Sequence, residues 1–401
     1  MSTLDTAYPV GSTPRPPLCR IAVIRLSLRD FRCHRALHLE LAAEPVILVG
    51  ANGSGKTSVL EALSLLAPGR GLRRAPLGEM LYTNGGTRAA AWSVTARLQA
   101  PVAPVDIVSG FAEDGARDRR QLSIDGQVSR SRAALAELLA VIWLTPDMDR
   151  LFADGPQARR RFLDRLVWGV DPAHAGRVAA YERALQQRSA LLRRSQPEAA
   201  WLTALEETMA AHGVAVAAAR RQTTAQLTAI AASAPPDFPA VRVAASGAVE
   251  DWLDDGPALA VEERLRGAFA ESRSADATSG GAAVGPHRSD MQVHHGSSGR
   301  RAQECSTGEQ KMLLISLVLS GCRLLARERG TPPLLLLDDV AAHLDAARRA
   351  AVFEAVADLG AQAWYAGCDP EVFRPLVGRA QVLSLDAVPP AATLHEAEAI
   401  G

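Results

Sequence analysis

The stretch from Gly50 to Thr57, GANGSGKT, carries glycines, a lysine and a threonine at the spacing G-x-x-x-x-G-K-T, which is typical of loops that hold phosphate groups. An apolar run precedes it and a helical pattern follows, which disfavours the alternative of a glycine-rich turn without a ligand. Glycines let backbone N–H groups approach phosphate oxygens, and a helix start adds positive partial charge. We expect a nucleotide, ATP with Mg2+, to be bound by Gly50, Ala51, Asn52, Gly53, Ser54, Gly55, Lys56, Thr57 and Ser58.

Lysine is rare in this chain. Only Lys56 and Lys311 are lysines among 44 basic residues, so arginine is used almost everywhere else. An ammonium is a compact point charge, whereas a guanidinium is a planar fork, so a retained lysine indicates a place that needs the compact charge. Lys56 is therefore predicted to reach the terminal phosphates and to be catalytic, and Thr57 is predicted to coordinate Mg2+.

Two acids follow four leucines in the stretch from Leu334 to Asp339, LLLLDD. A charge at the end of a core strand is costly unless a cation offsets it, and Mg2+ prefers oxygen ligands. We expect Asp338 to hold the metal through its water shell and Asp339 to polarise the attacking water. Apolar strands ending in acids are common, so this interpretation depends on the phosphate loop upstream.

A third stretch, Cys305 to Gln310 (CSTGEQ), precedes a long apolar helix pattern. By itself it is a good helix cap. Its place shortly before LLLLDD makes it similar to the signature motif of ABC-type ATPases, whose serine contacts the γ-phosphate held by the opposite protomer. That resemblance implies a homodimer closed over two ATP molecules. The residues implied at its interface are Ser306, Gly308 and Gln310, with Asp345 in a run, AHLD, that looks like the D-loop.

The composition is that of a globular protein without a strong overall field. The chain has 401 residues, 48% of them hydrophobic, and zero formal net charge, so any nucleic-acid surface must be a local patch. Five scattered cysteines form no C-x-x-C pair, which disfavours disulfides and zinc and suits a reducing cytoplasm. Without a signal-peptide pattern or a long apolar run, we expect a cytoplasmic protein with no membrane segment.

The motifs need an α/β framework. The resemblance to ABC-type and SMC-like ATPases implies a P-loop ATPase head, a mixed sheet with flanking helices, and the composition predicts an inserted, mainly helical arm. Residues 156–226 are rich in Ala, Arg, Leu and Gln, which indicates long helices. Residues 271–283 are polar and are predicted to form a loop. The expected divisions are a flexible leader (1–19), the first part of the head (20–145), the arm (146–283) and the second part of the head (284–401).

Several other stretches resemble the RecF family of bacterial recombination mediators, which have an SMC-like head. The runs G-P-x-x-R-R-x-F-L-D and G-P-H-R are much more specific than the nucleotide motifs. His287, inside the second run, has no Cys or His cluster around it and is expected to make structural hydrogen bonds. The matching stretches are Asp30-Phe31-Arg32, GANGSGKTSVLEAL with GRGLR, Pro146-Asp147, Gly155-Pro156 with ARRRFLD, Tyr181 with LQQRSALL, GPHRSD and LLLLDDVAAHLD.

The resemblance implies a weak ATPase that dimerises on ATP and binds DNA near single-strand to double-strand junctions. It would help RecO and RecR to load RecA at gaps in damaged DNA, and Arg32 would join the nucleotide site. The chain departs from the family locally, with Ser189 for a frequent Asn and Ala366 for a Thr. It also lacks the γ-phosphate-sensing histidine that many ABC-type ATPases place at the end of the last strand. Either another residue senses the phosphate or hydrolysis is slow, as suits a timer.

Arginines at high density could neutralise DNA phosphates without reading sequence. A solvated, arginine-rich helix face is an equal alternative in a chain that uses arginine everywhere. The predicted DNA contacts are Arg70, Arg73, Arg74, Arg159, Arg160 and Arg161, with Arg165 on the same helix as the last three.

Two other classes of protein are alternatives. A soluble ABC transporter ATPase subunit would have a shorter span between Lys56 and Asp338. An SMC-like head of a nuclease complex would carry long coiled coils, whereas residues 146–283 are too few for these and show no sustained heptads.

Overall fold

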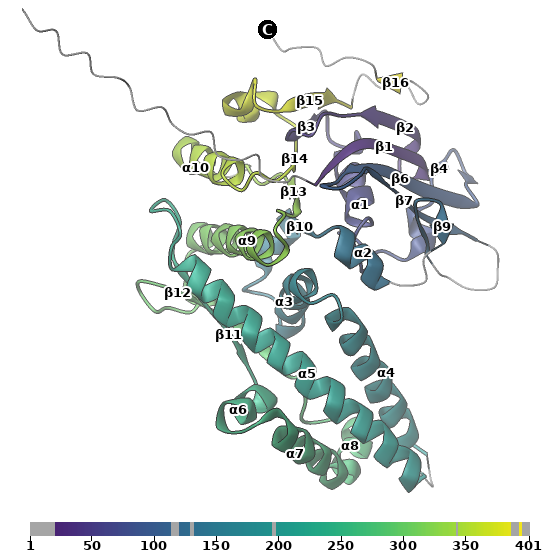
Figure 1. Cartoon of the computed structure of the whole chain (residues 1–401), viewed down its shortest axis with the longest axis vertical. Helices are drawn as coiled ribbons and strands as arrows, with labels where there is room; N and C mark the ends of the chain where they lie inside the picture. The colour runs from purple at the N-terminus through teal and green to yellow at the C-terminus, as the bar shows by residue number, and fades with distance from the viewer. Residues whose placement is uncertain are drawn as a thin grey trace, which may run out of the picture.

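The chain has an upper part built on two sheets and a lower part made mainly of helices (Figure 1). Among the described residues, no helix combines the length and the apolar character needed to cross a membrane. The predicted leader, 1–19, lies outside the described residues. This computed structural model describes residues 21–113, 120–128, 132–194, 198–341, 344–385 and 393–394.

A five-stranded parallel sheet, ordered β10-β13-β14-β3-β15, positions the motifs. Both faces are covered: Leu335 and Leu337 pack into one core, whereas Leu334 and Leu336 pack into the other. Continuous apolar runs such as LLLL are typical of parallel strands buried on both faces. The strands are β3 (Val46–Val49), β10 (Val141–Leu144), β13 (Leu334–Asp338), β14 (Ala363–Gly367) and β15 (Gln381–Ser384).

A seven-stranded sheet, ordered β16-β2-β1-β6-β7-β8-β9, lies beyond α1 (Lys56–Ser64), which contacts strands of both sheets. An Asp-Gly turn joins β8 to β9, with φ of 48° at Asp125 and 76° at Gly126. The strands are β1 (Ala22–Phe31), β2 (His34–Glu40), β6 (Ala91–Gln99), β7 (Val105–Ala112), β8 (Gln121–Ile124), β9 (Gln127–Val128) and β16 (Thr393–Leu394), and a separate pair is β4 (Thr83–Asn84) with β5 (Thr87–Arg88).

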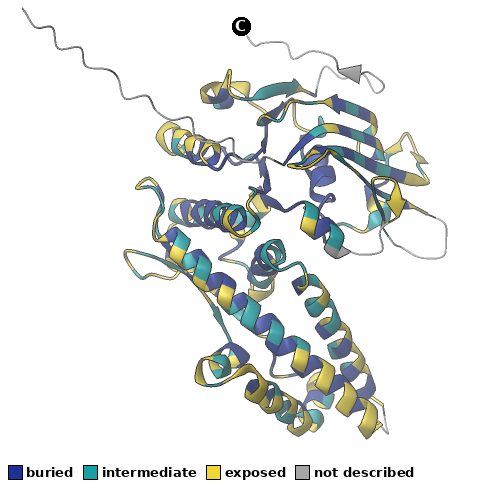
Figure 2. Cartoon of the chain, viewed as in Figure 1, coloured by how far each residue is buried: buried dark blue, intermediate teal, exposed yellow. Residues whose placement is uncertain are grey.

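The other face of the parallel sheet is covered by α9 (Thr307–Arg329), which ends at Gly330 with φ of 70°. Figure 2 shows β3, β10, β13, β14 and the middle of α9 as buried, whereas β15 at the edge of the sheet is only partly buried. The remaining helices of the upper part are α2 (Arg132–Leu138), α10 (Ala346–Ala357), η1 (Leu77–Met80), η2 (Pro146–Arg150), η3 (Ala302–Glu304) and η4 (Pro370–Leu376).

The lower part contains the long helices predicted from composition. The longest, α5, runs from the far end of the arm back to α9, which it contacts (Figure 1). The strands β11 and β12 pair across the boundary proposed at residues 283 and 284, and the division into domains stays a prediction. The elements are α3 (Pro156–Val170), α4 (His174–Leu192), α5 (Ala199–Ala231), β11 (Val241–Ser246), α6 (Ala248–Asp255), α7 (Ala258–Glu271), α8 (Arg273–Ser279) and β12 (Asp290–His295).

The prediction of a loop over residues 271–283 is wrong, because α8 occupies much of that segment. Asp276 on α8 is buried and accepts hydrogen bonds from Arg188 Nη1 at 2.8 Å and Ser272 Oγ at 2.6 Å. One of the polar residues that suggested a loop, Asp276, is therefore the acid of a buried ion pair. Its bond to Arg188 on α4 fixes α8 against the rest of the arm.

Candidate functional site

The phosphate loop joins the end of β3 to the start of α1, as predicted. Its glycines Gly50, Gly53 and Gly55 have φ of 154°, 88° and 96°, and the last two lie in the left-handed region that favours glycine. A Cβ added to Gly55 would lie 2.4 Å from Nε2 of His34 and 2.7 Å from the sulfur of Cys33. The turn between β1 and β2 therefore packs so closely on the loop that only glycine fits.

Polar groups in the loop are arranged for an anion. The Ser54 Oγ is buried and has no hydrogen-bond partner in the described part of the chain, and α1 starts without a side-chain cap. Lys56 is buried, and its Nζ donates to the carbonyls of Gly50 at 2.7 Å and Ala51 at 2.8 Å. A phosphate oxygen is a stronger acceptor than a carbonyl, so this geometry suits a lysine that closes on a phosphate.

Thr57 and Asp338 meet at the sheet edge, where the Thr57 hydroxyl donates to the Asp338 carboxylate at 3.2 Å. Burial raises the pKa of Asp338, and the neighbouring Asp339 charge adds to the rise against the opposing effect of Thr57 and nearby cations. A hydroxyl beside a costly buried carboxylate is an oxygen donor set that fits Mg2+, because the cation would offset the buried charge.

Asp339 has an unusual backbone for a residue other than glycine. Its φ is 48°, and its N–H donates to the carbonyl of Ala366 at 3.0 Å. A Cβ added to Gly367 would lie 3.9 Å from the Asp339 carboxylate, so this carboxylate faces the end of β14. Positive φ outside glycine is often kept where it aims a functional group.

Arg32 lies beside the loop, but its guanidinium is already engaged. Its Nε and Nη2 donate to the two oxygens of the fully buried Glu61 at 2.8 and 2.7 Å, and its Nη1 donates to the Glu79 carbonyl at 2.9 Å. Arg73 approaches the same carboxylate at 3.7 Å. A nucleotide contact by Arg32 stays a prediction, and it would have to use the remaining N–H groups of this guanidinium.

The signature stretch begins α9 with a capping box between Ser306 and Glu309. Gln310 Nε2 donates to the Cys305 carbonyl at 2.9 Å, and Asp345 caps α10 by accepting from its third residue at 2.8 Å. Within the described ranges, no hydrogen bond or ion pair joins Ser306, Gly308, Gln310 or Asp345 to the phosphate loop. Ala342 and His343, in the predicted D-loop, lie outside the described residues.

Comparisons with known proteins agree with this arrangement. The sequence matches the model of the RecF/RecN/SMC N terminal domain over residues 22–372. The DNA replication and repair protein RecF of Mesorhizobium japonicum is 43% identical over 91% of this chain and 96% of its own length. The corresponding protein of Rhizobium etli (strain CIAT 652) is 40% identical over 91% and 97%. The chain belongs to the RecF family. It is thus one of a family of DNA replication and repair proteins.

Two solved structures share the fold. They are described as the recombination mediator protein RecF-ATPrS and RecF-ATP in the RecFOR pathway, with TM-scores of 0.78 and 0.75. Each covers 88% of this chain and 94% of the solved chain, at 21% and 22% identity. The predicted fold class, an ABC/SMC-like ATPase head with flanking helices, is confirmed.

Sequence reasoning missed three side chains at the phosphate loop of this RecF-family chain. Cys368 directly follows β14, where no histidine was found, and its thiol donates to Asn52 Oδ1 at 2.9 Å. From the turn between β1 and β2, the His34 Nε2 lies 3.2 Å from the Gly55 carbonyl, and the Cys33 sulfur lies 3.7 Å from Ser58 Oγ. No sequence motif marks these three residues. The only sequence sign that Cys33 and His34 lie at the loop was their position directly after Arg32.

The arginines predicted to contact DNA separate into two groups. Arg70, Arg74 and Arg161 are exposed. The pKa of Arg74 is lowered by partial burial and then by the charges of Arg161 and Arg70, which therefore lie near it. They come from the segment after α1 and from α3. Arg73 is also exposed but turns toward Glu61.

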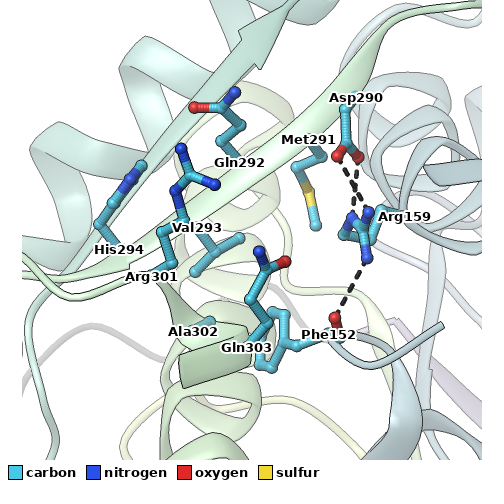
Figure 3. Close-up of a pocket in the computed structure, with 10 residues that line it drawn as sticks. All are labelled: Phe152, Arg159, Asp290, Met291, Gln292, Val293, His294, Arg301, Ala302 and Gln303. Atoms are coloured by element: carbon cyan, nitrogen blue, oxygen red, sulfur yellow. Dashed lines mark hydrogen bonds and ion pairs between the residues drawn. The ribbon is translucent and has the colours of Figure 1, made fainter. Parts of the chain in front are cut away.

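Arg159 and Arg165 are held by contacts inside the chain, so a DNA contact by either stays a prediction without support from the geometry. Arg159 is buried and binds both oxygens of Asp290 at 2.8 and 2.9 Å, as Figure 3 shows. Arg165 stacks 4.0 Å from the centre of the Trp143 ring, and burial lowers its pKa to about 9. Arg160 is half-buried with Nη1 donating to the Ser289 carbonyl at 2.6 Å, so its contact with DNA stays a prediction. Arginine density along a helix does not tell which faces are buried.

Proposed function

We propose that this RecF-family chain is an ATP-dependent DNA-binding protein whose ATP-driven dimer marks gaps for recombinational repair. The observation that carries the proposal is the Thr57–Asp338 pair at 3.2 Å beside the buried Lys56 and the unpartnered Ser54 hydroxyl. These groups together offer an anion site and a magnesium site at one edge of the parallel sheet.

The residues of the loop would divide the work at the nucleotide. Bound Mg2+ would neutralise charge on the phosphates, held by Thr57 and by Asp338 through water. Lys56 would exchange its carbonyl partners for phosphate oxygens, and the backbone from Gly50 to Ser58 would surround the phosphates. Asp339 would accept a hydrogen bond from the attacking water and so orient it toward the γ-phosphate.

A second copy of the chain would complete the site. In the part of the chain that the structure describes, Ser306 bonds to Glu309 and Gln310 bonds to Cys305, both at the start of α9, and Ser306 and Gly308 are exposed. In the sandwich arrangement of ABC-type ATPases, these residues and Asp345 would face the nucleotide of the partner. The chain would then be a monomer without ATP and a dimer with it.

Slow hydrolysis would make the nucleotide a timer. A thiol is a weak hydrogen-bond donor compared with an imidazole, so Cys368 at the end of β14 offers little stabilisation to a developing phosphate charge. The closed dimer would persist on DNA near single-strand to double-strand junctions. There it would assist RecO and RecR in loading RecA, in keeping with the RecFOR pathway named for the similar solved structures.

The exposed group Arg70, Arg74 and Arg161 is the part of the predicted DNA surface that the geometry supports. Two alternatives lose support from family membership: the soluble ABC transporter ATPase subunit and the SMC-like head of a nuclease complex. Relatives at 43% and 40% identity over nearly their whole lengths are named as replication and repair proteins.

The test is sedimentation of the purified chain with and without ATP, Mg2+ and a gapped duplex. We expect ATP to convert monomers to dimers that co-sediment with the duplex. Lys56→Met should remain monomeric, because it removes the charge that holds the terminal phosphates. Arg374→Met, at an exposed position of η4, is the control and should behave as the wild type. A wild-type chain that stays monomeric with ATP and ignores DNA would refute the proposal.

A further inference from the structure

A row of polar side chains crosses the small sheet formed by β11 and β12. Arg242 on β11 pairs directly with His294 on β12, and His294 forms a bridge with Arg301 on its other side. Residues directly opposite each other on neighbouring strands point to the same face. Arg242, His294 and Arg301 therefore stand side by side on one face, while Val241 and Val293 on the other face are buried.

The row has no partners inside the molecule. In the part of the chain that the structure describes, the side chains of Arg242, His294 and Arg301 make no hydrogen bond or ion pair. The adjacent Arg300, by contrast, donates to Glu309 at 2.8 Å. Two guanidinium groups flanking one imidazole, with no acid between them, cost stability that an anion would recover.

A pocket of about 60 Å3 adjoins the row. Figure 3 shows Arg301 and Gln303 extending from the segment around η3 toward β12, where His294 and Gln292 lie. The amide groups of both glutamines have no hydrogen-bond partner among the described residues, so they add donors to those of the arginine. Behind them, the Arg159–Asp290 pair closes the pocket as an internally neutral wall.

The spacing of the row indicates the kind of anion. Three residues on adjacent strands span two interstrand distances, about 10 Å in all. Such a span exceeds a single phosphate group and suits successive phosphates along a chain. Arginine, histidine and glutamine side chains are typical of contacts to phosphate oxygens that carry no sequence information.

The row is also connected to the signature stretch. Arg301 is the N-cap residue of η3. Its carbonyl accepts a hydrogen bond from the thiol of Cys305, the residue before Ser306. Arg300 binds one oxygen of Glu309, and the other oxygen of that carboxylate caps the backbone of Ser306. An anion that fixed Arg301 would therefore also restrict the turn from Arg300 to Ser306, through these bonds.

We propose that Arg242, His294 and Arg301 form a binding site for the phosphodiester backbone of DNA, and that its occupation orders the signature turn for the ATP dimer. The inference rests on the proposed function and adds a second DNA contact, on other elements than Arg70, Arg74 and Arg161. It makes DNA binding and dimer closure one coupled event at the start of α9.

The test compares a double variant, Arg242→Gln with Arg301→Gln, with a charge-matched control, Arg97→Gln with Arg374→Gln. Both control arginines are exposed and lie at the long-distance limit of an ion pair. The probe is a dye-labelled gapped duplex, titrated at several salt concentrations by fluorescence anisotropy with ATP present. Losing two phosphate contacts should lower the slope of log affinity against log salt by about 2.

Coupling gives a second readout. The row variant should keep the DNA-free ATP turnover of the wild type but lose its stimulation by the duplex, whereas the control should keep both. The inference would be overturned if the row variant matched the control in its salt slope and in the stimulation of its ATP turnover by the duplex. The proposed function would remain intact in that case, provided that the wild-type chain binds the duplex. If the row variant kept its DNA affinity but no longer dimerised with ATP, the row would serve the partner's nucleotide, and the inference would again be overturned. A wild-type chain that binds no DNA would overturn the inference and the proposed function together.

Discussion

At the scale of single residues, the phosphate loop has a reactive neighbour in Cys33. Burial acts to raise the pKa of this thiol, but its hydrogen bond and charge interaction with His34 outweigh burial, and the net pKa is lowered. Other cysteines behave in the opposite way, because burial raises the pKa of Cys322 to about 12 and that of Cys305 above its ordinary value. The exposed Cys33 should therefore hold more thiolate at neutral pH than Cys305 or Cys322.

Alkylation of the folded chain by iodoacetamide should modify Cys33 before Cys305 or Cys322. Thiolate forms as pH rises through the folded pKa, so the rate at Cys33 should reach half of its maximum at a lower pH than for an unperturbed thiol. Peptide mass spectrometry across a pH series measures the rate at each cysteine. His34→Gln should move the Cys33 profile to higher pH, and an unmoved profile would contradict the role of the imidazole. ATP should slow the reaction, because the thiol lies against the loop.

Residues whose chemistry is written in a short motif could be predicted, whereas residues that act through distant partners could not. Lys56 and Thr57 lie together because one strand, loop and helix hold them, and Asp338 meets Thr57 because β13 ends at the same edge of the parallel sheet. The Arg32–Glu61 pair joins different elements, and no spacing rule connects its members. His287 was rightly expected to be structural, with Nδ1 2.6 Å from the Tyr181 hydroxyl and Nε2 2.9 Å from the Ala282 carbonyl.

At the scale of elements, buried arginines tie the helices of the arm together. Arg220 on α5 binds both oxygens of Asp164 on α3 at 2.8 and 2.9 Å, and His174 on α4 approaches the same carboxylate at 2.9 Å. Farther out, Arg188 on α4 binds Glu206 on α5 and Asp276 on α8. Each ionic group joins three helices, so the arm relies on charges as well as on its apolar core.

Replacing Asp164 by Asn should destabilise the chain by about 3 kcal/mol, because it leaves the buried Arg220 charge without a counter-charge. Burial acts to raise the pKa of Asp164, but Arg220 and His174 outweigh it and lower the pKa to about 2. The stabilisation is therefore complete above the unfolded-state pKa and is lost as pH falls toward 2. Urea unfolding across a pH series measures the difference.

The matched control for that prediction is Asp254→Asn, whose carboxylate is mostly exposed beside Arg221 on the same arm. Its effect should stay within about 1 kcal/mol, because exposed ion pairs contribute little. Equal losses in the two variants would show that the buried group at Asp164 has no special role.

Helices and strands could be predicted where a local pattern of apolar residues marks them. They could not be predicted where a contact with a distant residue decides the local structure. The run LLLLDD indicated β13 because both faces of a parallel strand are apolar. The polar segment around Asp276 carries no comparable period, and it becomes helix α8 because Arg188, 88 positions away in sequence, neutralises that acid. The expectation for Arg159 and Arg165 of α3 lost support for the same reason, since their positions depend on Asp290 and Trp143, which are distant in sequence.

At the scale of the whole molecule, the nucleotide motifs occupy one edge of the sheet but do not form a closed site in one chain. Thr57 of the loop and Asp338 meet through a direct hydrogen bond, whereas Ser306, at the start of α9, makes no hydrogen bond to the loop among the described residues. The family's motif order made the fold predictable. The arm boundary at residues 283 and 284 stays a prediction, and β11 and β12 pair across it.

Ser306→Arg is the variant that separates nucleotide binding from assembly. The phosphate loop is untouched, so the variant should bind ATP as the wild type does, but a bulky cation in place of the serine hydroxyl should prevent closure over the partner's γ-phosphate. Loss of the N-cap would also cost about 1 kcal/mol, so thermal melting must confirm that the variant is folded at the assay temperature. Ser306→Thr keeps a hydroxyl and the cap and should still dimerise. Sedimentation with ATP and Mg2+ distinguishes the two, and dimers of Ser306→Arg at wild-type ATP concentrations would refute the sandwich arrangement, because no closed dimer of that geometry has room for the longer side chain at the phosphate.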